Sequence, residues 1–110
     1  MSGASDDPSG EASGTASGGS AVLTRTVRVP NRRGLHARAA AKFVTLAERY
    51  GASVEVLRDG QSVSARSIMG LMMLGAGQGA TLELQAEGWD AKEAIEALAA
   101  LVEAGFHERD

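Results

Sequence analysis

The sequence contains no cysteine, so neither a disulfide framework nor a thiolate metal site can form, and the chain suits a reducing compartment. It also has no apolar run of about 18 residues that could span a bilayer, and no basic start followed by an apolar stretch as in a secretory signal. We therefore expect a cytoplasmic protein without a membrane partner. No histidines or carboxylates have the spacing of metal ligands or of an acid–base pair, so we expect neither a metal nor another cofactor.

Large apolar side chains are missing, apart from Met1, from the first twenty residues, which are mainly Gly, Ser, Ala, Asp and Glu. Such a segment cannot offset the entropy of ordering by burying apolar surface. We therefore predict a disordered tail over residues 1–20 and one folded domain over residues 21–110. About 90 residues are enough for one modest hydrophobic core and too few for two.

Four short segments of the predicted domain have the pattern of β-strands. In two of them polar and apolar residues alternate, as on a strand with one face in water. The other two are joined by Asp59-Gly60, a dipeptide that favours the positive φ angles of a type I′ turn. The predicted strands are residues 24–29, 53–58, 61–64 and 81–86.

Two longer segments have the three- and four-residue apolar spacing of amphipathic helices. The first covers residues 36–50, and Gly51 is placed to end it in a left-handed conformation. The second follows Asp90, which we expect to form a capping box with Glu93, and it ends before Gly105.

A third, shorter helix of one or two turns is predicted over residues 68–74, with Ser67 as its N-cap. The complete order is then strand, helix, strand, strand, helix, strand, helix. This order predicts an α+β fold, an open-faced two-layer sandwich in which three helices cover one face of a four-stranded antiparallel sheet.

The chemically informative stretch is Asn-Arg-Arg-Gly-Leu-His-Ala-Arg at residues 31–38, between the first predicted strand and the first helix. His36 is expected at the helix N-terminus, where free N–H groups, such as that of Ala37, bind anions and a positive imidazole is disfavoured. A neutral imidazole can attack phosphorus without a general base. Arg38, in the first turn, can hold the phosphoryl oxygens with its planar guanidinium, and Arg33 adds a weaker contribution.

The pattern Asn-x-x-Gly-Leu-His-Ala-Arg resembles the active-site signature of the HPr family, the histidine-containing phosphocarriers of the phosphoenolpyruvate-dependent phosphotransferase system. Residues 66–72 are similar to the family's regulatory serine segment, and the resemblance extends from Ala21 to about Phe106. It implies a phosphocarrier rather than an enzyme, monomeric, that turns over only with partner proteins. By this resemblance Enzyme I phosphorylates Nδ1 of His36, and the group passes to an Enzyme IIA-type protein.

The same resemblance gives roles to the predicted short helix. Ser67 would be a regulatory phosphorylation site, with an HPr kinase/phosphatase as an additional candidate partner, and Ile68, Met69 and Met72 would dock partners. Ser67 is also explained as a simple N-cap, and both interpretations stay open. Ala39 replaces the proline that the family usually carries after the arginine. Since related sequences with alanine there are often nitrogen-related and regulatory, sugar transport and regulation both stay open.

A second hypothesis is a small nucleic-acid-binding module that uses an arginine cluster near the start of the domain. The net charge of −3 and the absence of aromatic residues from the predicted strands speak against it. The arginines fit a phosphate and an acidic docking partner better. The cluster consists of Arg25, Arg28, Arg32 and Arg33.

Overall fold

The computed structural model describes residues 21–109, so the tail predicted over residues 1–20 lies outside the described residues. The order of strands and helices is the predicted one, followed by a short 3₁₀ helix, η3. The elements are β2 (Leu23–Arg28), α1 (Ala37–Ala47), β3 (Ser53–Arg58), β4 (Gln61–Ser64), α2 (Ile68–Met73), β5 (Thr81–Glu87), α3 (Ala91–Glu103) and η3 (Gly105–His107).

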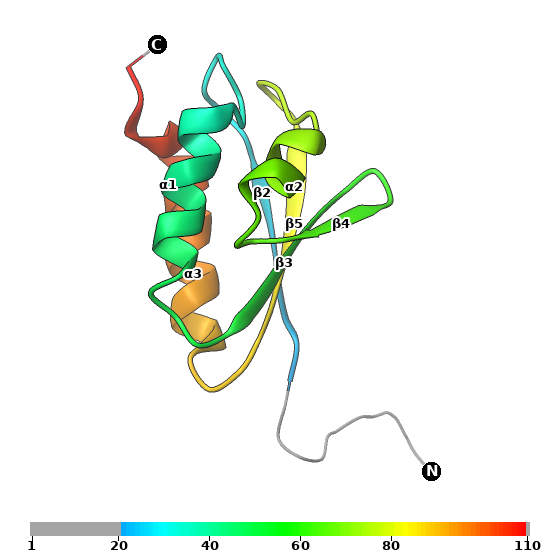
Figure 1. Cartoon of the computed structure of the whole chain (residues 1–110), viewed down its shortest axis with the longest axis vertical. Coiled ribbons are helices and arrows are strands. Elements are labelled where there is room, and N and C mark those ends of the chain that lie inside the picture. The colour runs from blue at the N-terminus through cyan, green and yellow to red at the C-terminus, as the bar shows by residue number, and fades with distance from the viewer. Residues whose placement is uncertain (1–20, 110) are drawn as a thin grey trace.

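The four strands form one sheet in the order β2-β5-β3-β4, and every neighbouring pair is antiparallel. The helices lie on one face of this sheet and leave its other face open (Figure 1). The predicted open-faced two-layer sandwich is therefore confirmed. None of the helices within residues 21–109 has the length and hydropathy that a membrane-spanning segment requires.

The core lies between the sheet and the helices, and the alternation in β5 shows how the sequence builds it. Leu82 and Leu84 are fully buried, while Thr81 is exposed to solvent. From the helices, Phe43 and Leu98 fill the same layer and are also fully buried. An apolar stripe on each helix thus covers the apolar face of the strands.

The local turn and cap predictions for two segments are confirmed. Asp59 and Gly60 have φ angles of 50° and 81°, as the hairpin turn between β3 and β4 requires. Ser67 is the N-cap of α2, and its Oγ accepts a hydrogen bond from the backbone N–H of Gly70 at 2.9 Å. The cap satisfies a backbone donor that the short helix cannot satisfy itself.

The predicted end of the first helix is wrong. α1 ends at Ala47, and Gly51 does not have the positive φ angle expected of a left-handed C′ residue. Gly51 lies instead against a side chain from a distant part of the chain, since a Cβ at this position would be 2.8 Å from Nε1 of Trp89. The surroundings of this glycine are therefore set by long-range packing rather than by helix termination.

The predicted capping box of the last helix is also wrong. Asp90 precedes α3 as predicted, but its side chain makes no capping hydrogen bond. Its buried carboxylate accepts hydrogen bonds from the backbone N–H groups of Gly51 (2.9 Å) and Ala52 (2.8 Å). Both donors lie in the connection between α1 and β3. By accepting from both of them, the carboxylate holds this connection against the one between β5 and α3.

Candidate functional site

The loop before α1 has a shape that only glycine permits at position 34. Gly34 has a φ angle of 66°, and a Cβ there would lie 2.3 Å from the carbonyl oxygen of Ala76 and 2.7 Å from Cα of Gly77. The backbone N–H of Leu35 donates a hydrogen bond of 2.9 Å to the same carbonyl. The glycine-rich loop before β5, residues 75–79, therefore supports the loop that carries His36.

His36 lies at the N-terminus of α1, as predicted, and is its N-cap. Its backbone is extended, its carbonyl accepts the N–H of Ala40 at 2.8 Å, and its side chain makes no capping hydrogen bond to the helix. The N–H groups of Ala37 and Arg38 are among the first four of the helix, so they have no acceptor within it. The residues predicted to bind phosphate thus lie in the first turn, beside the predicted nucleophile.

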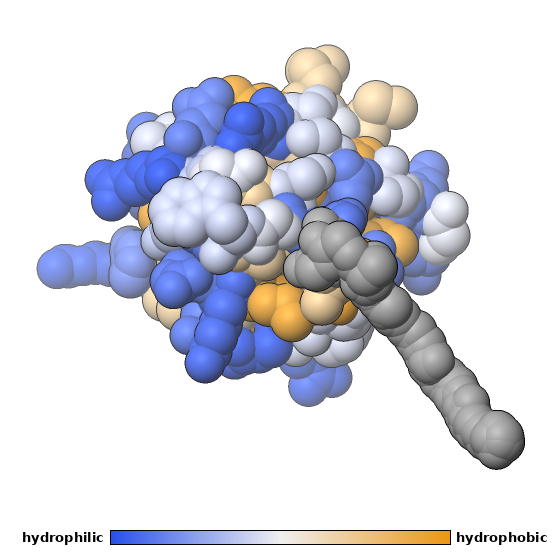
Figure 2. Space-filling view, turned by 90° about the horizontal axis from the view of Figure 1, so that it is seen from below, coloured by the Kyte–Doolittle hydropathy of each residue, from blue (hydrophilic) through white to orange (hydrophobic). Residues whose placement is uncertain are grey.

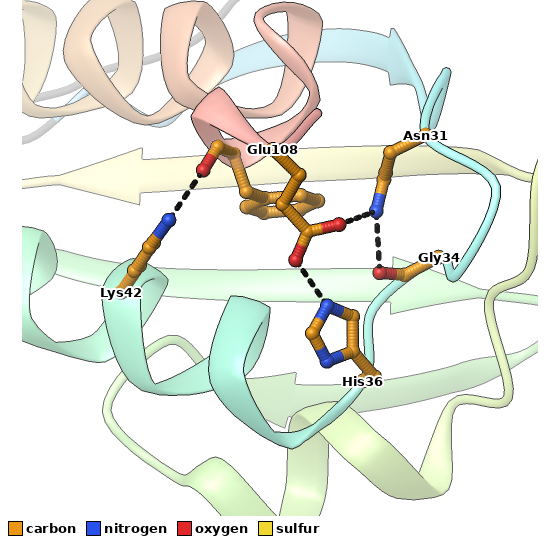
Figure 3. Close-up of polar contacts among 6 residues, drawn as sticks. Asn31, Gly34, His36, Lys42 and Glu108 are labelled. Atoms are coloured by element: carbon orange, nitrogen blue, oxygen red, sulfur yellow. Dashed lines mark hydrogen bonds and ion pairs between the residues drawn. The ribbon is translucent and has the colours of Figure 1, made fainter. Parts of the chain in front are cut away.

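The imidazole of His36 contacts a residue that the sequence analysis missed. Its Nε2 is hydrogen-bonded to carboxylate Oε2 of Glu108, which lies 72 positions later in the chain (Figure 3). Both side chains are largely buried, with 15% of His36 and 11% of Glu108 exposed. The second ring nitrogen, Nδ1, points away from the carboxylate in Figure 3.

Asn31 connects the loop that carries His36, which we call the histidine loop, to Glu108. Its side-chain Nδ2 donates to the carbonyl oxygen of Gly34 and to Oε1 of Glu108, both at 2.9 Å (Figure 3). Because both neighbouring groups are acceptors, the side-chain nitrogen of Asn31, and not its side-chain oxygen, must face them. Asn31 is buried, and its Oδ1 has no hydrogen-bond partner in the structure. The sequence analysis included Asn31 in a motif but gave it no role.

The surroundings of Glu108 keep its carboxyl ionised. Burial by itself raises the pKa of this carboxyl, but hydrogen bonds from His36 and Asn31 and the positive charge of Arg33 outweigh that effect. The net result is a pKa below the ordinary value for glutamate. At neutral pH the side chain of Glu108 is therefore a carboxylate, which only accepts hydrogen bonds.

A strained turn after α3 brings Glu108 to the histidine. Gly105, Phe106 and His107 have φ angles of 63°, 57° and 59°, and the last two are residues that rarely adopt such values. The side chain of Phe106 is fully buried, and its carbonyl accepts a hydrogen bond of 2.8 Å from Nζ of Lys42. Burial of the phenyl ring and this hydrogen bond offset the cost of the turn.

A small hollow of about 250 Å³ lies against Glu108, and most of its lining is basic. The side chain of Arg38 makes no hydrogen bond or ion pair with another described residue, so its guanidinium is available to an anion. His107 is exposed here. We call this feature the basic hollow; its lining residues are Arg33, Arg38, Lys42, His107, Glu108 and Arg109.

The short helix α2 presents a second distinct surface. Met69 and Met73 are 69% and 73% exposed, and Ile68 and Met72 are also exposed, while Leu71 is buried. We call the four exposed residues the methionine surface; Met73 was not among the predicted docking residues. Figure 1 places α2 and the beginning of α1 at the same end of the molecule. The opposite end, seen in Figure 2, is mostly hydrophilic with small separate apolar patches.

The arginine cluster of the alternative hypothesis does not form one surface. Arg25 and Arg28 differ in parity along β2, so they project from opposite faces of the sheet. Arg25 lies 3.8 Å from the carboxylate of Glu103 on α3. Within residues 21–109 there is also no group of three or more histidines or carboxylates that could hold a metal ion.

Comparisons with known proteins show which family the chain resembles. Residues 23–104 match the family model described as PTS HPr component phosphorylation site. The phosphocarrier protein HPr of Cupriavidus necator is 46% identical over 87 residues, 79% of this chain and 98% of the relative. The phosphocarrier protein NPr of Shewanella violacea is 43% identical over 86 residues, 78% of this chain and 94% of the relative.

Solved structures extend the similarity to the fold. The crystal structure of HPr from Thermoanaerobacter tengcongensis superposes with a TM-score of 0.76 at 44% identity, covering 80% of this chain and 99% of that one. None of these relatives supports the nucleic-acid alternative. The chain belongs to the HPr family, the phosphocarrier proteins of the phosphotransferase system.

Proposed function

We propose that this protein accepts a phosphoryl group from phospho-Enzyme I on Nδ1 of His36 and transfers it to an Enzyme IIA-type protein. The observation that supports the proposal is the position of His36 at the N-terminus of α1, next to the basic hollow. In the transfer, the lone pair of Nδ1 forms the N–P bond while the bond between phosphorus and Enzyme I breaks. Transfer to the acceptor repeats this exchange with the acceptor's nucleophile.

The groups around His36 can stabilise the negative charge of the phosphoryl group during its transfer. Phosphoryl transfer needs positioning and electrostatic stabilisation more than covalent help from the protein. The N–H groups of Ala37 and Arg38 are not used by the helix and lie at the positive end of its dipole. The guanidinium of Arg38 has no partner among the described residues and can bind phosphoryl oxygens through two parallel hydrogen bonds.

We propose that Enzyme I and the acceptor dock on the methionine surface and on the basic hollow. Methionine side chains adapt to more than one partner, and an exposed apolar group beside the phosphorylation site is a suitable contact area. The positive charges of the hollow attract acidic groups and set the orientation of the partner. In this proposal the protein acts as a monomer in the cytoplasm, in agreement with a sequence that has no cysteine.

The proposal covers a sugar-transport and a regulatory, nitrogen-related phosphotransferase system. The HPr and NPr relatives have comparable identities, 46% and 43%, so similarity does not choose between the systems. Ala39, which stands in place of the usual proline, is fully buried and therefore does not alter the docking surface directly. Mixing the phosphorylated protein with acceptors of each type, and measuring which acceptor gains phosphate, decides between them.

We also propose that phosphorylation of Ser67 regulates docking. Ser67 already caps α2, so a phosphate at this place meets the free N–H groups of the first turn and leaves the fold intact. It adds a charge of about −1.5 to −2 next to Met69, which is exposed. That charge opposes contact with an apolar or acidic partner surface. A kinase of the HPr kinase/phosphatase type would be the regulating partner.

The central test uses the two histidines of the chain as a matched pair. The protein, His36→Ala and His107→Ala are incubated with phosphoenolpyruvate and Enzyme I, and the incorporated phosphate is tested for stability in acid and base. We expect acid-labile, base-stable phosphate on the parent and on His107→Ala, and none on His36→Ala. Undiminished labelling of His36→Ala would overturn the proposal. Salt-sensitive RNA or DNA binding that His36→Ala leaves unchanged would instead favour the nucleic-acid hypothesis.

A further inference from the structure

We infer that Glu108 is a positioning residue for His36, which holds the imidazole in the tautomer that leaves the lone pair on Nδ1. The inference rests on the proposed function and deepens it, since it explains which ring nitrogen reacts, and its structural part can be tested without Enzyme I. It starts from the pair of contacts that the Glu108 carboxylate makes in Figure 3.

The tautomer follows from the chemistry of the two partners. An ionised carboxylate has no proton to donate, so Nε2 of His36 must donate in its hydrogen bond to Glu108. A neutral imidazole carries one proton, and with that proton on Nε2 the lone pair belongs to Nδ1. Nδ1 points away from the carboxylate, so an incoming phosphoryl group approaches it without displacing Glu108.

Glu108 is itself held from two sides, and this makes it able to orient a ring. Its Oε1 accepts the amide N–H of Asn31, which also bonds the loop carbonyl of Gly34. The preceding turn is fixed by the buried side chain of Phe106 and by the hydrogen bond from Lys42 to the Phe106 carbonyl. Two consecutive non-glycine residues with positive φ angles persist only where the surroundings determine them, and such strain is concentrated at functional sites.

The hydrogen bond between His36 and Glu108 also stabilises the ring during phosphoryl transfer. When the lone pair of Nδ1 forms the N–P bond, the electron pair of the broken bond stays with Enzyme I. The ring of His36 keeps its Nε2 proton and gains a positive charge, and no proton has to move. The carboxylate of Glu108 lies next to that N–H and stabilises the charge. When the acceptor removes the phosphoryl group, the ring returns to the neutral Nε2–H tautomer.

The test compares the ring of His36 in three variants by ¹⁵N NMR, at a pH where the imidazole is neutral. Glu108→Ala removes the acceptor, and Glu108→Gln keeps one acceptor oxygen but removes the charge. Glu103→Ala is the matched control, because it removes an exposed carboxylate near the end of α3 that lies 3.8 Å from Arg25. We expect the Nε2–H tautomer in the parent and in the control, a mixture in Glu108→Ala, and an intermediate population in Glu108→Gln.

The rate of phosphorylation by Enzyme I is the second measurement. Carboxylates that orient metal-bound histidines contribute on the order of ten- to a hundredfold to activity, and we expect a loss of that size in Glu108→Ala. Glu108→Gln should lie between this variant and the parent, and Glu103→Ala should match the parent. Thermal unfolding of each variant checks that the fold is kept.

Two results would overturn the inference. One is the same tautomer population in Glu108→Ala as in the parent. The other is faster phosphorylation of Glu108→Ala, which would make Glu108 an obstruction that must leave His36 before the reaction. If the parent is not phosphorylated by Enzyme I at all, the proposed function fails. The NMR comparison still decides the role of Glu108 in that case.

Discussion

Replacing Gly34 by alanine tests whether the histidine loop depends on the glycine-rich loop behind it. Two separate costs are expected. A left-handed backbone costs a residue with a Cβ about 1–2 kcal/mol, and the φ angle here is 66°. The new methyl carbon would also lie 2.3 Å from the carbonyl oxygen of Ala76, and overpacking of this kind costs about 1–3 kcal/mol.

The size of the effect follows from these two costs. Backbone atoms cannot turn away as a side chain does, so the two loops must separate, and the hydrogen bond from Leu35 to Ala76 is weakened. We expect Gly34→Ala to lower the free energy of unfolding by about 2–5 kcal/mol. For a domain of this size, each kcal/mol lowers Tm by about 4–8 °C, which gives a decrease of at least about 8 °C.

Two other glycines provide matched controls. Gly60 has a φ angle of 81° and no atom within 4 Å of the place that a methyl group would occupy, so Gly60→Ala carries only the backbone cost of about 1–2 kcal/mol. Gly51 has no positive φ, and its new methyl would meet the side chain of Trp89, which is 89% exposed and can move. Gly51→Ala should therefore change stability by about 0.5 kcal/mol or less.

Thermal and urea unfolding followed by circular dichroism measures all three variants. The expected order of destabilisation is Gly34→Ala, then Gly60→Ala, then Gly51→Ala. At a temperature where Gly34→Ala is still folded, phosphorylation of His36 should also be slower, because the loop that carries the histidine has moved. Equal stability of Gly34→Ala and Gly60→Ala would refute the reasoning, since it would mean that the contact with Ala76 has no cost.

Three further predictions concern the site and the docking surface. Arg38→Lys keeps the charge but loses the planar fork, so transfer from Enzyme I should slow on the order of a hundredfold; an unchanged rate would assign Arg38 to docking. Ser67→Asp and Met69→Glu should each leave Tm within a few degrees but slow phosphorylation of His36, and parent rates in both would exclude the methionine surface as the docking site. The pKa of Glu108 is lowered in the folded protein, so its ionised form contributes stability that is present above the unfolded pKa and lost as pH falls through the folded one. The difference in unfolding free energy between the parent and Glu108→Gln, measured in urea, should therefore shrink as pH falls from neutral through the acid range in which carboxyl groups titrate, and a constant difference would contradict this.

Much of the fold could be predicted because its signals are local. The alternation of buried and exposed residues in β5 and the regular apolar spacing of α3 are each complete within one element. The hairpin turn at Asp59 and Gly60 and the cap at Ser67 likewise depend on neighbouring residues only. Local patterns of this kind are reliable when the tertiary structure has no reason to override them.

The two incorrect fold predictions have one cause in common. The usual local preferences place Asp90 as a cap of α3 and Gly51 at the end of α1. In the structure the two residues bond to each other across 39 positions, and the carboxylate of Asp90 serves the backbone before β3 instead. A sequence pattern contains no information on which distant donors will need an acceptor.

The candidate site likewise has one part that local patterns predict and another part that they do not. The positions of His36, Ala37 and Arg38 at the start of a helix could be predicted, because helix periodicity begins directly after the histidine. The contact of Glu108 with His36 could not, because no local pattern links two residues that lie 72 positions apart. Its approach also requires positive φ angles at Phe106 and His107, which non-glycine residues rarely adopt.

The sheet explains why such distant segments meet at one histidine. β2 and β5 are neighbours, and past the end of β2 the backbone of Val29 still bonds Ala80 and Gly79, at 2.8 Å and 2.7 Å. The histidine loop and the glycine-rich loop therefore leave the sheet side by side. The turn after α3 packs against the middle of α1 through its contact with Lys42, and Glu108 then reaches His36. Because Glu108 and the loop that carries His36 come from different elements, we expect the orientation of the reacting ring to require the whole folded domain, whereas the free N–H groups at the start of α1 belong to a single element.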